Sequence, residues 1–388
     1  MKTYDVVIVG GGIIGGSIAF ELTQRNLRVA VLDRQELMQE ASWAAAGMLS
    51  PAPDSPAAIP IVPLGRASLA LYPQFVAAVE EASEIRTGYR TDGALEALCH
   101  GDAERELSTL VALHHGLGLA CEPLSLEEAR EMEPALGRDV RAAAFLPDEA
   151  SVNPRSLTAA LLTAGENTGA TLYPGVEVTS LIKSGEHCTG VKTTDGESFF
   201  AEHVVLAAGC WTSQIREAAP YAPTHPVRGQ MVALRHASEP ILRVLRSERG
   251  YIVPRDHATP QNLVAGSTLE NAGYAKAVTS GGLEQILGAV NELAPRLAGA
   301  EILETWSGLR PGTPDQLPIL GPTDMEGLMI ATGHYRNGIL LAPVTAKLIT
   351  EWITERKVSL NCEDFSPMRF VCGNADRSAP ADGSATAE

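Results

Sequence analysis

The sequence contains no long hydrophobic run: across its 388 residues, no stretch approaches the ~18 apolar residues that a membrane-spanning helix needs. The apolar run at residues 6–9 is short and ends in glycines instead of a cleavage site, so it does not predict a signal peptide. We therefore expect a cytoplasmic protein that does not bind membranes.

Basic residues are also scarce. The chain has 30 Lys and Arg against 47 Asp and Glu, which gives a formal net charge of −17. A surface with this charge repels nucleic acid and anionic membranes, so the composition favours small-molecule partners. The length allows a large core and two domains.

Cysteine spacing excludes two further classes of protein. The six cysteines occur without a CxxC pair, so the sequence predicts neither a zinc site nor a disulfide framework. We expect them to be buried thiols, and we expect no metal. They are Cys99, Cys121, Cys188, Cys210, Cys362 and Cys372.

A glycine loop near the start of the chain carries the first positive signal. Gly10 and Gly12 lie between an apolar strand and a helix expected at residues 13–25, and Gly15 lies in the first turn of that helix, as in the G-x-G-x-x-G motif that holds a pyrophosphate. Asp33 ends the next strand, where its carboxylate can accept hydrogen bonds from a ribose and would repel a 2′-phosphate. NADP is therefore disfavoured, but the loop alone does not separate NAD from FAD.

Three later stretches favour FAD. Residues 203–211 (HVVLAAGCW) and 327–343 (GLMIATGHYRNGILLAP) each end an apolar strand in Ala-x-Gly, so the chain leaves the first sheet and returns to it twice. This is typical of enzymes whose flavin lies extended across the domain. Residues 40–51 (EASWAAAGMLSP) form a loop of small side chains, which lets backbone amides approach a flat ring.

Local patterns predict two further features. Asn153 and Pro154 are typical of the cap and first position of a helix, which we expect to end before Gly169. Asp92-Gly93 predicts a hairpin turn.

The chain resembles the FAD-dependent D-amino-acid oxidase superfamily and, within it, the glycine oxidase family of thiamine biosynthesis. The matching segments are spread over residues 4–370 and include VVIVGGGIIGGSIAFEL, ASWAAAGML, YIVPR, WSGLRPGTPDQLPILG and TGHYRNGILLAP. Two positions depart from the family pattern. Asp33 replaces the usual glutamate, and Asn26 replaces a glycine, although asparagine also tolerates positive φ.

The resemblance implies an α/β fold: a Rossmann-like FAD-binding domain of the glutathione-reductase type, with an α+β substrate domain built on a mixed or antiparallel sheet. The expected boundaries are 1–85, 148–220 and 306–370 for the FAD-binding domain, 86–147 and 221–305 for the substrate-binding domain, and 371–388 for a disordered tail.

The resemblance also implies which residues contact FAD. It places them in the glycine loop, at the acid after the second strand, in the small-residue loop and around the two Ala-x-Gly segments. They are Gly10, Gly12, Ile13, Ile14, Gly15, Asp33, Arg34, Ala41, Ser42, Ala46, Gly47, Met48, Val176, Ala208, Gly209, Gly333, His334, Tyr335, Arg336, Asn337, Gly338, Ile339 and Leu340. LRPGTPD contains no cysteine for a covalent flavin link, so we expect non-covalent FAD.

Three residues are implied to act on the substrate. Arg310, in WSGLRPG, would bind the carboxylate of an amino acid, because a guanidinium offers two parallel hydrogen bonds. Tyr251 would donate its hydroxyl to the same carboxylate, and Arg336 would reach toward it. No paired carboxylates and no Ser-His-Asp arrangement are evident in these motifs, and none is needed when the cofactor carries the redox chemistry.

The expected reaction is oxidation of glycine and related small amines, such as sarcosine and small D-amino acids, by hydride transfer to the flavin. Oxygen would then reoxidise the flavin to give hydrogen peroxide. Three alternatives stay open: oxidation of an N-carboxymethyl amine in secondary metabolism, an FAD-dependent dehydrogenase that avoids oxygen, and a non-catalytic flavin subunit. The resemblance also suggests a homodimer or homotetramer.

Overall fold

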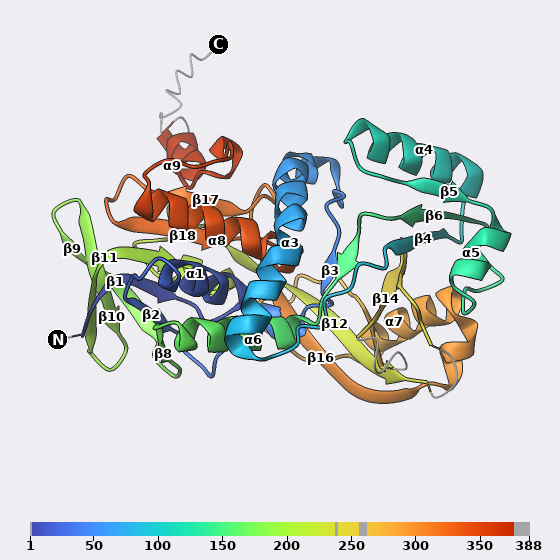
Figure 1. Cartoon of the computed structure of the whole chain (residues 1–388), viewed down its shortest axis with the longest axis horizontal. Helices are drawn as coiled ribbons and strands as arrows, with labels where there is room; N and C mark the ends of the chain where they lie inside the picture. The colour runs from blue at the N-terminus through green and yellow to red at the C-terminus, as the bar shows by residue number, and fades with distance from the viewer. Residues whose placement is uncertain (1, 237–239, 256–261, 376–388) are drawn as a thin grey trace, which may run out of the picture.

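The computed structural model describes residues 2–236, 240–255 and 262–375, and most of their strands form two large sheets (Figure 1). The first sheet has the order β17-β18-β11-β1-β2-β8, with β9 and β10 attached beside β11. Its strands are β1 (Lys2–Val9), β2 (Val29–Leu32), β8 (Thr171–Tyr173), β9 (Val178–Ser184), β10 (His187–Thr193), β11 (Ser198–Leu206), β17 (Ile319–Pro322) and β18 (Leu328–Thr332).

The centre of the first sheet is parallel: β1 pairs in parallel with β2 and β11, and β11 with β18. Both faces are covered, which explains the continuous apolar run in β1. Val6 and Ile8 pack against helices, while Val7 and Val9 pack into a second cluster with residues of β9, β10 and β11. The β-α-β unit expected from the glycine loop is present.

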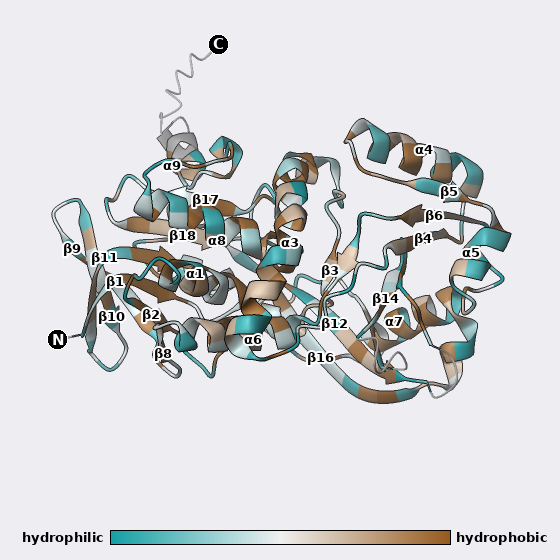
Figure 2. Ribbon diagram, in the orientation of Figure 1, coloured by the Kyte–Doolittle hydropathy of each residue, from teal (hydrophilic) through white to brown (hydrophobic). Residues whose placement is uncertain are grey.

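The second sheet has the order β16-β12-β15-β14-β13-β4-β6-β5 and is antiparallel except where β13 meets β4. Strands β4 and β6 are largely hydrophobic (Figure 2) and pack with helices α5 and α7 into a separate core. The strands are β4 (Ala94–Leu98), β5 (Glu122–Leu124), β6 (Ala142–Leu146), β12 (His225–Arg235), β13 (Val244–Ser247), β14 (Gly250–Pro254), β15 (Asn262–Gly266) and β16 (Glu301–Gly312). A short ladder joins β3 (Met48–Leu49) to β7 (Ala150–Ser151).

Helices α1, α3, α6 and α8 pack together over the first sheet, and α4, α5 and α7 accompany the second (Figure 1). Each sheet with its helices forms one half of the molecule. Helix α2 contacts α6 of the first half and β16 of the second, so it lies where the two halves meet. The bounds are α1 (Ile13–Thr23), α2 (Ala41–Ala44), α3 (Val62–Ser83), α4 (Ala103–Gly116), α5 (Leu126–Met132), α6 (Pro154–Asn167), α7 (Ser280–Leu293), α8 (Gly338–Thr354) and α9 (Met368–Ala375), with 3-10 turns η1 (Pro56–Ile61), η2 (Gly209–Gln214), η3 (Pro295–Gly299) and η4 (Glu363–Phe365).

The hairpin predicted at Asp92-Gly93 is wrong. Gly93 has φ 73°, as a turn glycine would, but β4 begins immediately after it and pairs with β6 and β13. The preceding residues form no strand, because Arg90 makes only an isolated bridge to Ser151. A glycine permits the turn, but distant strands decide the pairing.

The structure also bears on the predicted disordered tail and on the search for membrane-spanning helices. Helix α9 includes residues 371–375, which the sequence assigned to a disordered tail, while 376–388 lie outside the described residues. Among the helices that the structure describes, none is long and apolar enough to cross a membrane. The assignment of an FAD-binding and a substrate-binding domain to the two halves stays a prediction.

Candidate active site

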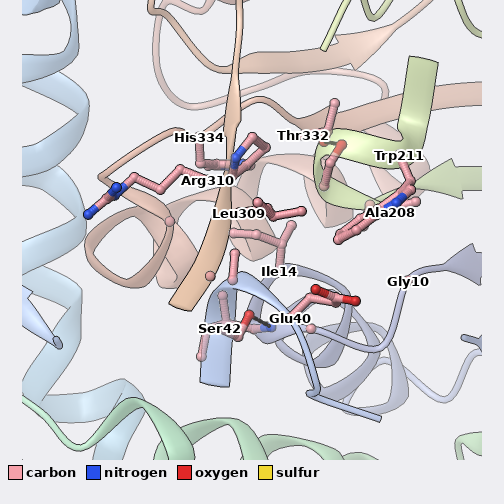
Figure 3. Close-up of a pocket in the computed structure, with 18 of the residues that line it drawn as sticks. Gly10, Ile14, Glu40, Ser42, Ala208, Trp211, Leu309, Arg310, Thr332 and His334 are labelled. Carbon is pink, nitrogen blue, oxygen red and sulfur yellow. Dashed lines mark hydrogen bonds between the residues drawn. The ribbon is translucent and has the colours of Figure 1, made fainter. Parts of the chain in front are cut away.

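A cavity of about 400 Å³ is lined by residues from both sheets, a volume within the roughly 300–1,000 Å³ of cofactor and ligand sites (Figure 3). The carboxyl ends of the parallel strands meet here, which is where open α/β sheets bind ligands. The first sheet contributes Val9, Leu32 and Ala331, with Ala207 directly after β11, and the second contributes Gly229, Met231, Tyr251, Leu309 and Arg310.

The glycine loop is packed too tightly for side chains. Gly10 has φ 115°, and a Cβ there would lie 2.4 Å from the carbonyl oxygen of Ala207. A Cβ on Gly15 would lie 1.9 Å from the carbonyl oxygen of Gly10. The loop therefore presents its backbone, and the N-terminus of α1 behind it, to the cavity. The backbone N–H of Ile13 donates to Ser42 Oγ at 2.8 Å, which ties the small-residue loop to this helix.

Asp33 lines the cavity beside the loop and already holds two backbone groups. Its Oδ2 accepts from the N–H of Gly11 at 2.7 Å, and its Oδ1 accepts from that of Gln35 at 3.0 Å. Burial raises the pKa of Asp33, although these two bonds oppose the shift. The carboxylate is fixed where a ribose hydroxyl could donate to it.

Arg310 lies at the opposite end of the cavity from Ala208 and Trp211 (Figure 3). Its Nη2 donates to Ser267 Oγ at 2.7 Å and its Nη1 to the carbonyl oxygen of Thr268 at 3.2 Å. No acidic side chain of the described residues forms an ion pair with it. Burial lowers the pKa of Arg310, as a buried cation without a counter-charge would require.

Tyr251 and Arg336 also line this cavity, together with Met231. The Tyr251 hydroxyl contacts Met231 Sδ at 3.4 Å, and its interaction with Arg310 opposes the fall in the pKa of that guanidinium. Arg336 is already paired, because its Nη1 lies 3.2 Å from Asp54 Oδ1. Of the two arginines, only Arg310 therefore lacks a described carboxylate partner.

His334 contributes a neutral ring to the lining. The residue is only 2% exposed, and its Nε2 lies 3.0 Å from Thr345 Oγ1. Burial lowers the pKa of His334 to about 3, so the imidazole carries no charge near neutral pH.

Most predicted contact residues line the cavity, and four do not. Gly15 packs against Gly10, and a Cβ on Gly333 would lie 2.5 Å from Thr313 Cγ2. Asn337 precedes α8, and the carbonyl oxygen of Leu340 accepts from Ser68 Oγ at 2.6 Å. The lining includes Gly10, Gly12, Ile13, Ile14, Asp33, Arg34, Ala41, Ser42, Ala46, Gly47, Met48, Val176, Ala208, Gly209, His334, Tyr335, Arg336, Gly338 and Ile339, and their contacts with a cofactor stay a prediction.

Sequence reasoning did not single out several lining residues. Glu40 and Trp211 lie inside segments that the sequence marked as important, so a signal was present there. Gly229 and Met231 gave none, since only the pairing of β12 with β16 brings them to the cavity.

These features fit an extended FAD. The backbone cradle and helix terminus suit a pyrophosphate, and Asp33 suits the ribose. The apolar side chains of Ile14, Leu309 and Ile339 suit a flat ring system. The five cysteines whose burial is described are Cys99, Cys121, Cys188, Cys210 and Cys362, and none of them lines the cavity. Within the described part of the chain, no cluster of side chains could hold a metal ion.

Comparison with known proteins agrees with this architecture. The chain is 39% identical to the bifunctional protein ThiO/ThiG of Synechocystis sp. over 95% of this chain and 54% of that protein, so it spans about half the length of this relative. It is 34% identical to the glycine oxidase of Geobacillus kaustophilus over 95% of this chain and 97% of the enzyme. The solved structure of a G. kaustophilus glycine oxidase matches with a TM-score of 0.88 at 34% identity, covering 95% of this chain and 99% of that one.

A second solved structure widens the range of relatives. The iminodiacetate oxidase of Chelativorans sp. matches with a TM-score of 0.83 at 26% identity, covering 93% of this chain and 98% of that one. These likenesses confirm the predicted fold class and the predicted resemblance. The family model described as FAD dependent oxidoreductase matches residues 5–352. The chain therefore belongs to the FAD dependent oxidoreductase family.

Proposed function

We propose that this chain oxidises glycine and related small amines, such as sarcosine and small D-amino acids, with molecular oxygen as the electron acceptor. The products are an imine or 2-oxo acid, ammonia or an amine, and hydrogen peroxide. Glycine oxidases similar to this chain along nearly their whole length support the proposal. A role in thiamine biosynthesis, a cytoplasmic location and a dimer or tetramer remain part of the proposal.

The observation that carries the proposal is the unpaired guanidinium of Arg310. It is oriented by Ser267 and Thr268, and it has no carboxylate partner among the described residues. A buried cation in this state is poised for an anionic ligand, and the planar guanidinium matches a carboxylate with two parallel bonds. A small amino acid supplies that carboxylate.

Each residue then has a limited task. FAD, when bound, supplies the acceptor for the hydride of the substrate α-carbon. Arg310 binds the substrate carboxylate, and the Tyr251 hydroxyl donates to the same group. His334, which lines the cavity, is neutral near neutral pH and would add no charge to the environment of the cofactor. Orientation and exclusion of water are the main contributions of the protein.

A second candidate is oxidation of an N-carboxymethyl amine, and the iminodiacetate oxidase similarity favours it. Iminodiacetate carries two carboxylates and would need a second cation. Arg336 lines the cavity, but Asp54 already neutralises it at 3.2 Å. With one arginine of the described lining lacking a carboxylate partner, the site suits a monocarboxylate such as glycine or sarcosine better than iminodiacetate, so glycine is the leading substrate.

The test is anaerobic mixing of the holoenzyme with glycine, sarcosine, D-alanine and iminodiacetate, with loss of flavin absorbance as the readout. Glycine or sarcosine should reduce the flavin fastest, and peroxide should form when air is admitted. Arg310→Ala should lower kcat/KM by about a hundredfold, or roughly 3 kcal/mol, the loss expected for a charge-assisted pair. Arg235→Ala removes an exposed arginine paired with Glu301 and serves as the control.

Three outcomes would count against the proposal. Unchanged glycine turnover in Arg310→Ala would remove the assigned role of this residue. Flavin reduction without peroxide would indicate a dehydrogenase, and no reduction by any amine would indicate a non-catalytic flavin subunit.

A further inference from the structure

The segment from Glu270 to Lys276, called the strap below, leads from β15 toward α7 and is firmly anchored on the second sheet. Its first residue exchanges backbone hydrogen bonds with Arg228 at 2.9 and 3.0 Å. The Glu270 carboxylate pairs with the Arg228 guanidinium and accepts from Gln230 Nε2 at 2.8 Å. Burial would raise the pKa of Glu270, but these bonds outweigh it and lower the pKa to about 2.

From this anchor the strap reaches residues that belong to the other half of the molecule. The Tyr274 hydroxyl donates to the carbonyl oxygen of Cys210 at 3.1 Å, and its ring centroid lies 5.8 Å from that of Trp211. Lys276 Nζ lies 3.0 Å from Glu40 Oε2. The strap therefore joins the second sheet to η2 and to the loop before α2.

These contacts close a circuit through residues that line one end of the cavity. The Arg34 guanidinium carbon lies 3.9 Å from the centroid of the Trp211 ring, and Arg34 Nη2 lies 3.2 Å from Glu40 Oε1. The order is Arg34, Glu40, Lys276, Tyr274, Trp211 and back to Arg34. Arg34, Glu40 and Trp211 line the cavity. The two strap residues, Tyr274 and Lys276, are not part of its lining.

The circuit lies at the end of the cavity that is next to the glycine loop. Figure 3 shows Glu40, Trp211, Ala208 and Gly10 together, away from the guanidinium of Arg310. The contacts therefore lie beside the part of the cavity next to the glycine loop, away from Arg310, the proposed binding site of the substrate carboxylate.

We propose that the strap is a clasp that retains FAD, with Lys276 and Tyr274 as its two closing side chains. The circuit must open between Lys276 and Glu40, or between Tyr274 and Trp211, before the nucleotide end can leave the cavity. The ion pair between Lys276 and Glu40 is weak alone, because a partly exposed ion pair stabilises little. Since the strap is anchored through Glu270, both contacts form together and act jointly on cofactor release. The clasp rests on the family's cofactor and not on the identity of the amine.

The test measures FAD release from the holoenzyme without substrate, by dilution and filtration, and FAD affinity by titration of the apoprotein. Lys276→Met should speed release roughly three- to fivefold, the most that a partly exposed ion pair supports. Lys276→Met with Tyr274→Ala should speed it further. Lys276→Arg keeps the charge and should restore slow release.

The matched control is Lys2→Met, which breaks a lysine–glutamate pair of similar geometry, Lys2 Nζ to Glu197 Oε2 at 2.8 Å, elsewhere on the protein. Salt gives an independent readout: added NaCl should speed release from the wild type and should have less effect on Lys276→Met, since screening acts on the ion pair.

Equal release from wild type and the double variant would overturn the clasp. So would an equal acceleration in Lys2→Met, or a fall in the melting temperature of the apoprotein that accounts for the whole change. With saturating FAD, the KM for the amine should not change. Failure of glycine to react would refute the proposed substrate and leave the release measurements unaffected.

Discussion

At the residue scale, the position of Arg310 depends on a glycine in the neighbouring strand. A Cβ on Gly229 would lie 2.2 Å from Arg310 Nη1 and 2.5 Å from its Cζ. The guanidinium therefore lies directly over the bare backbone of β12. It is the end of a long, flexible side chain, so an added methyl group would push it aside at little cost to the fold.

This contact predicts a specific defect in Gly229→Ala. Because the displaced guanidinium can no longer meet Ser267 and Thr268 while binding substrate, we expect the KM for glycine to rise at least about tenfold, or roughly 1.4 kcal/mol. FAD affinity and the urea midpoint should change little. Gly281→Ala, where the added Cβ meets nothing within 4 Å, is the matched control. An unchanged KM in Gly229→Ala would show that the guanidinium position is not needed.

His334 predicts a pH dependence of stability. Burial lowers its folded-state pKa to about 3, whereas an unfolded histidine titrates near ~6.5. As pH falls below ~6.5, the unfolded chain takes up a proton that the folded chain refuses, so the folded state loses stability down to about pH 3.

The measurement is urea unfolding of the apoprotein at pH 7 and pH 5. The wild type should lose up to about 2 kcal/mol more than His334→Gln between these two pH values. Comparing the difference between the two proteins removes the contribution of other histidines. Parallel pH profiles would mean that the imidazole is accessible to protons.

At the element scale, α6 shows how much a short pattern can predict. Asn153 Oδ1 accepts from the backbone N–H groups of Arg155 at 3.2 Å and Ser156 at 3.5 Å, and Pro154 occupies the first helical position. The cap was predicted because all its parts are adjacent in the sequence. This helix packs against α1 and α3 behind the first sheet, so its start affects that core.

Loss of this cap should destabilise the protein modestly. Asn153→Ala leaves two N–H groups without an acceptor, so the free energy of unfolding should fall by ~1 kcal/mol. Chemical denaturation of the apoprotein measures it. Asn291→Ala, on the exposed side of α7, should be neutral or slightly stabilising because alanine is the better helix former. Equal losses in both variants would contradict the assignment of the cap.

Neighbouring elements show where adjacency stops helping. The turn at Asp195-Gly196 connects β10 to β11, because the two strands follow each other directly in the chain. Gly93 has the positive φ of a turn glycine, but its strand pairs with segments about 50 and 150 residues later in the chain, as the register of β4 with β6 and β13 shows. Turn chemistry specifies a local bend, whereas pairing partners depend on the completed sheet.

At the scale of the whole molecule, the two halves meet around one cavity, and no described thiol reaches it. Burial raises the pKa of Cys210 to about 12, and that of Cys362 to about 11, so both stay protonated and inert near neutral pH. Non-covalent binding of FAD stays our prediction.

FAD should therefore be released intact by acid or heat. A denaturing gel should show no flavin fluorescence on the protein band, and the supernatant should contain all the flavin. Because FAD binds only the folded state, adding it to the apoprotein should raise the melting temperature in a concentration-dependent way. Fluorescence that stays with the denatured chain would refute the prediction.

The sequence by itself determined the features that depend on neighbouring residues: the glycine loop after β1, the acid at Asp33, the cap of α6 and the motif that carries Arg310. Their geometry follows from local sterics and hydrogen bonds, which a short segment already specifies. Only the tertiary structure decided that Gly229 lies under Arg310, that Asp54 neutralises Arg336, and that the strap reaches Glu40. These contacts join residues far apart in the chain, and their distances are set by how the two sheets pack.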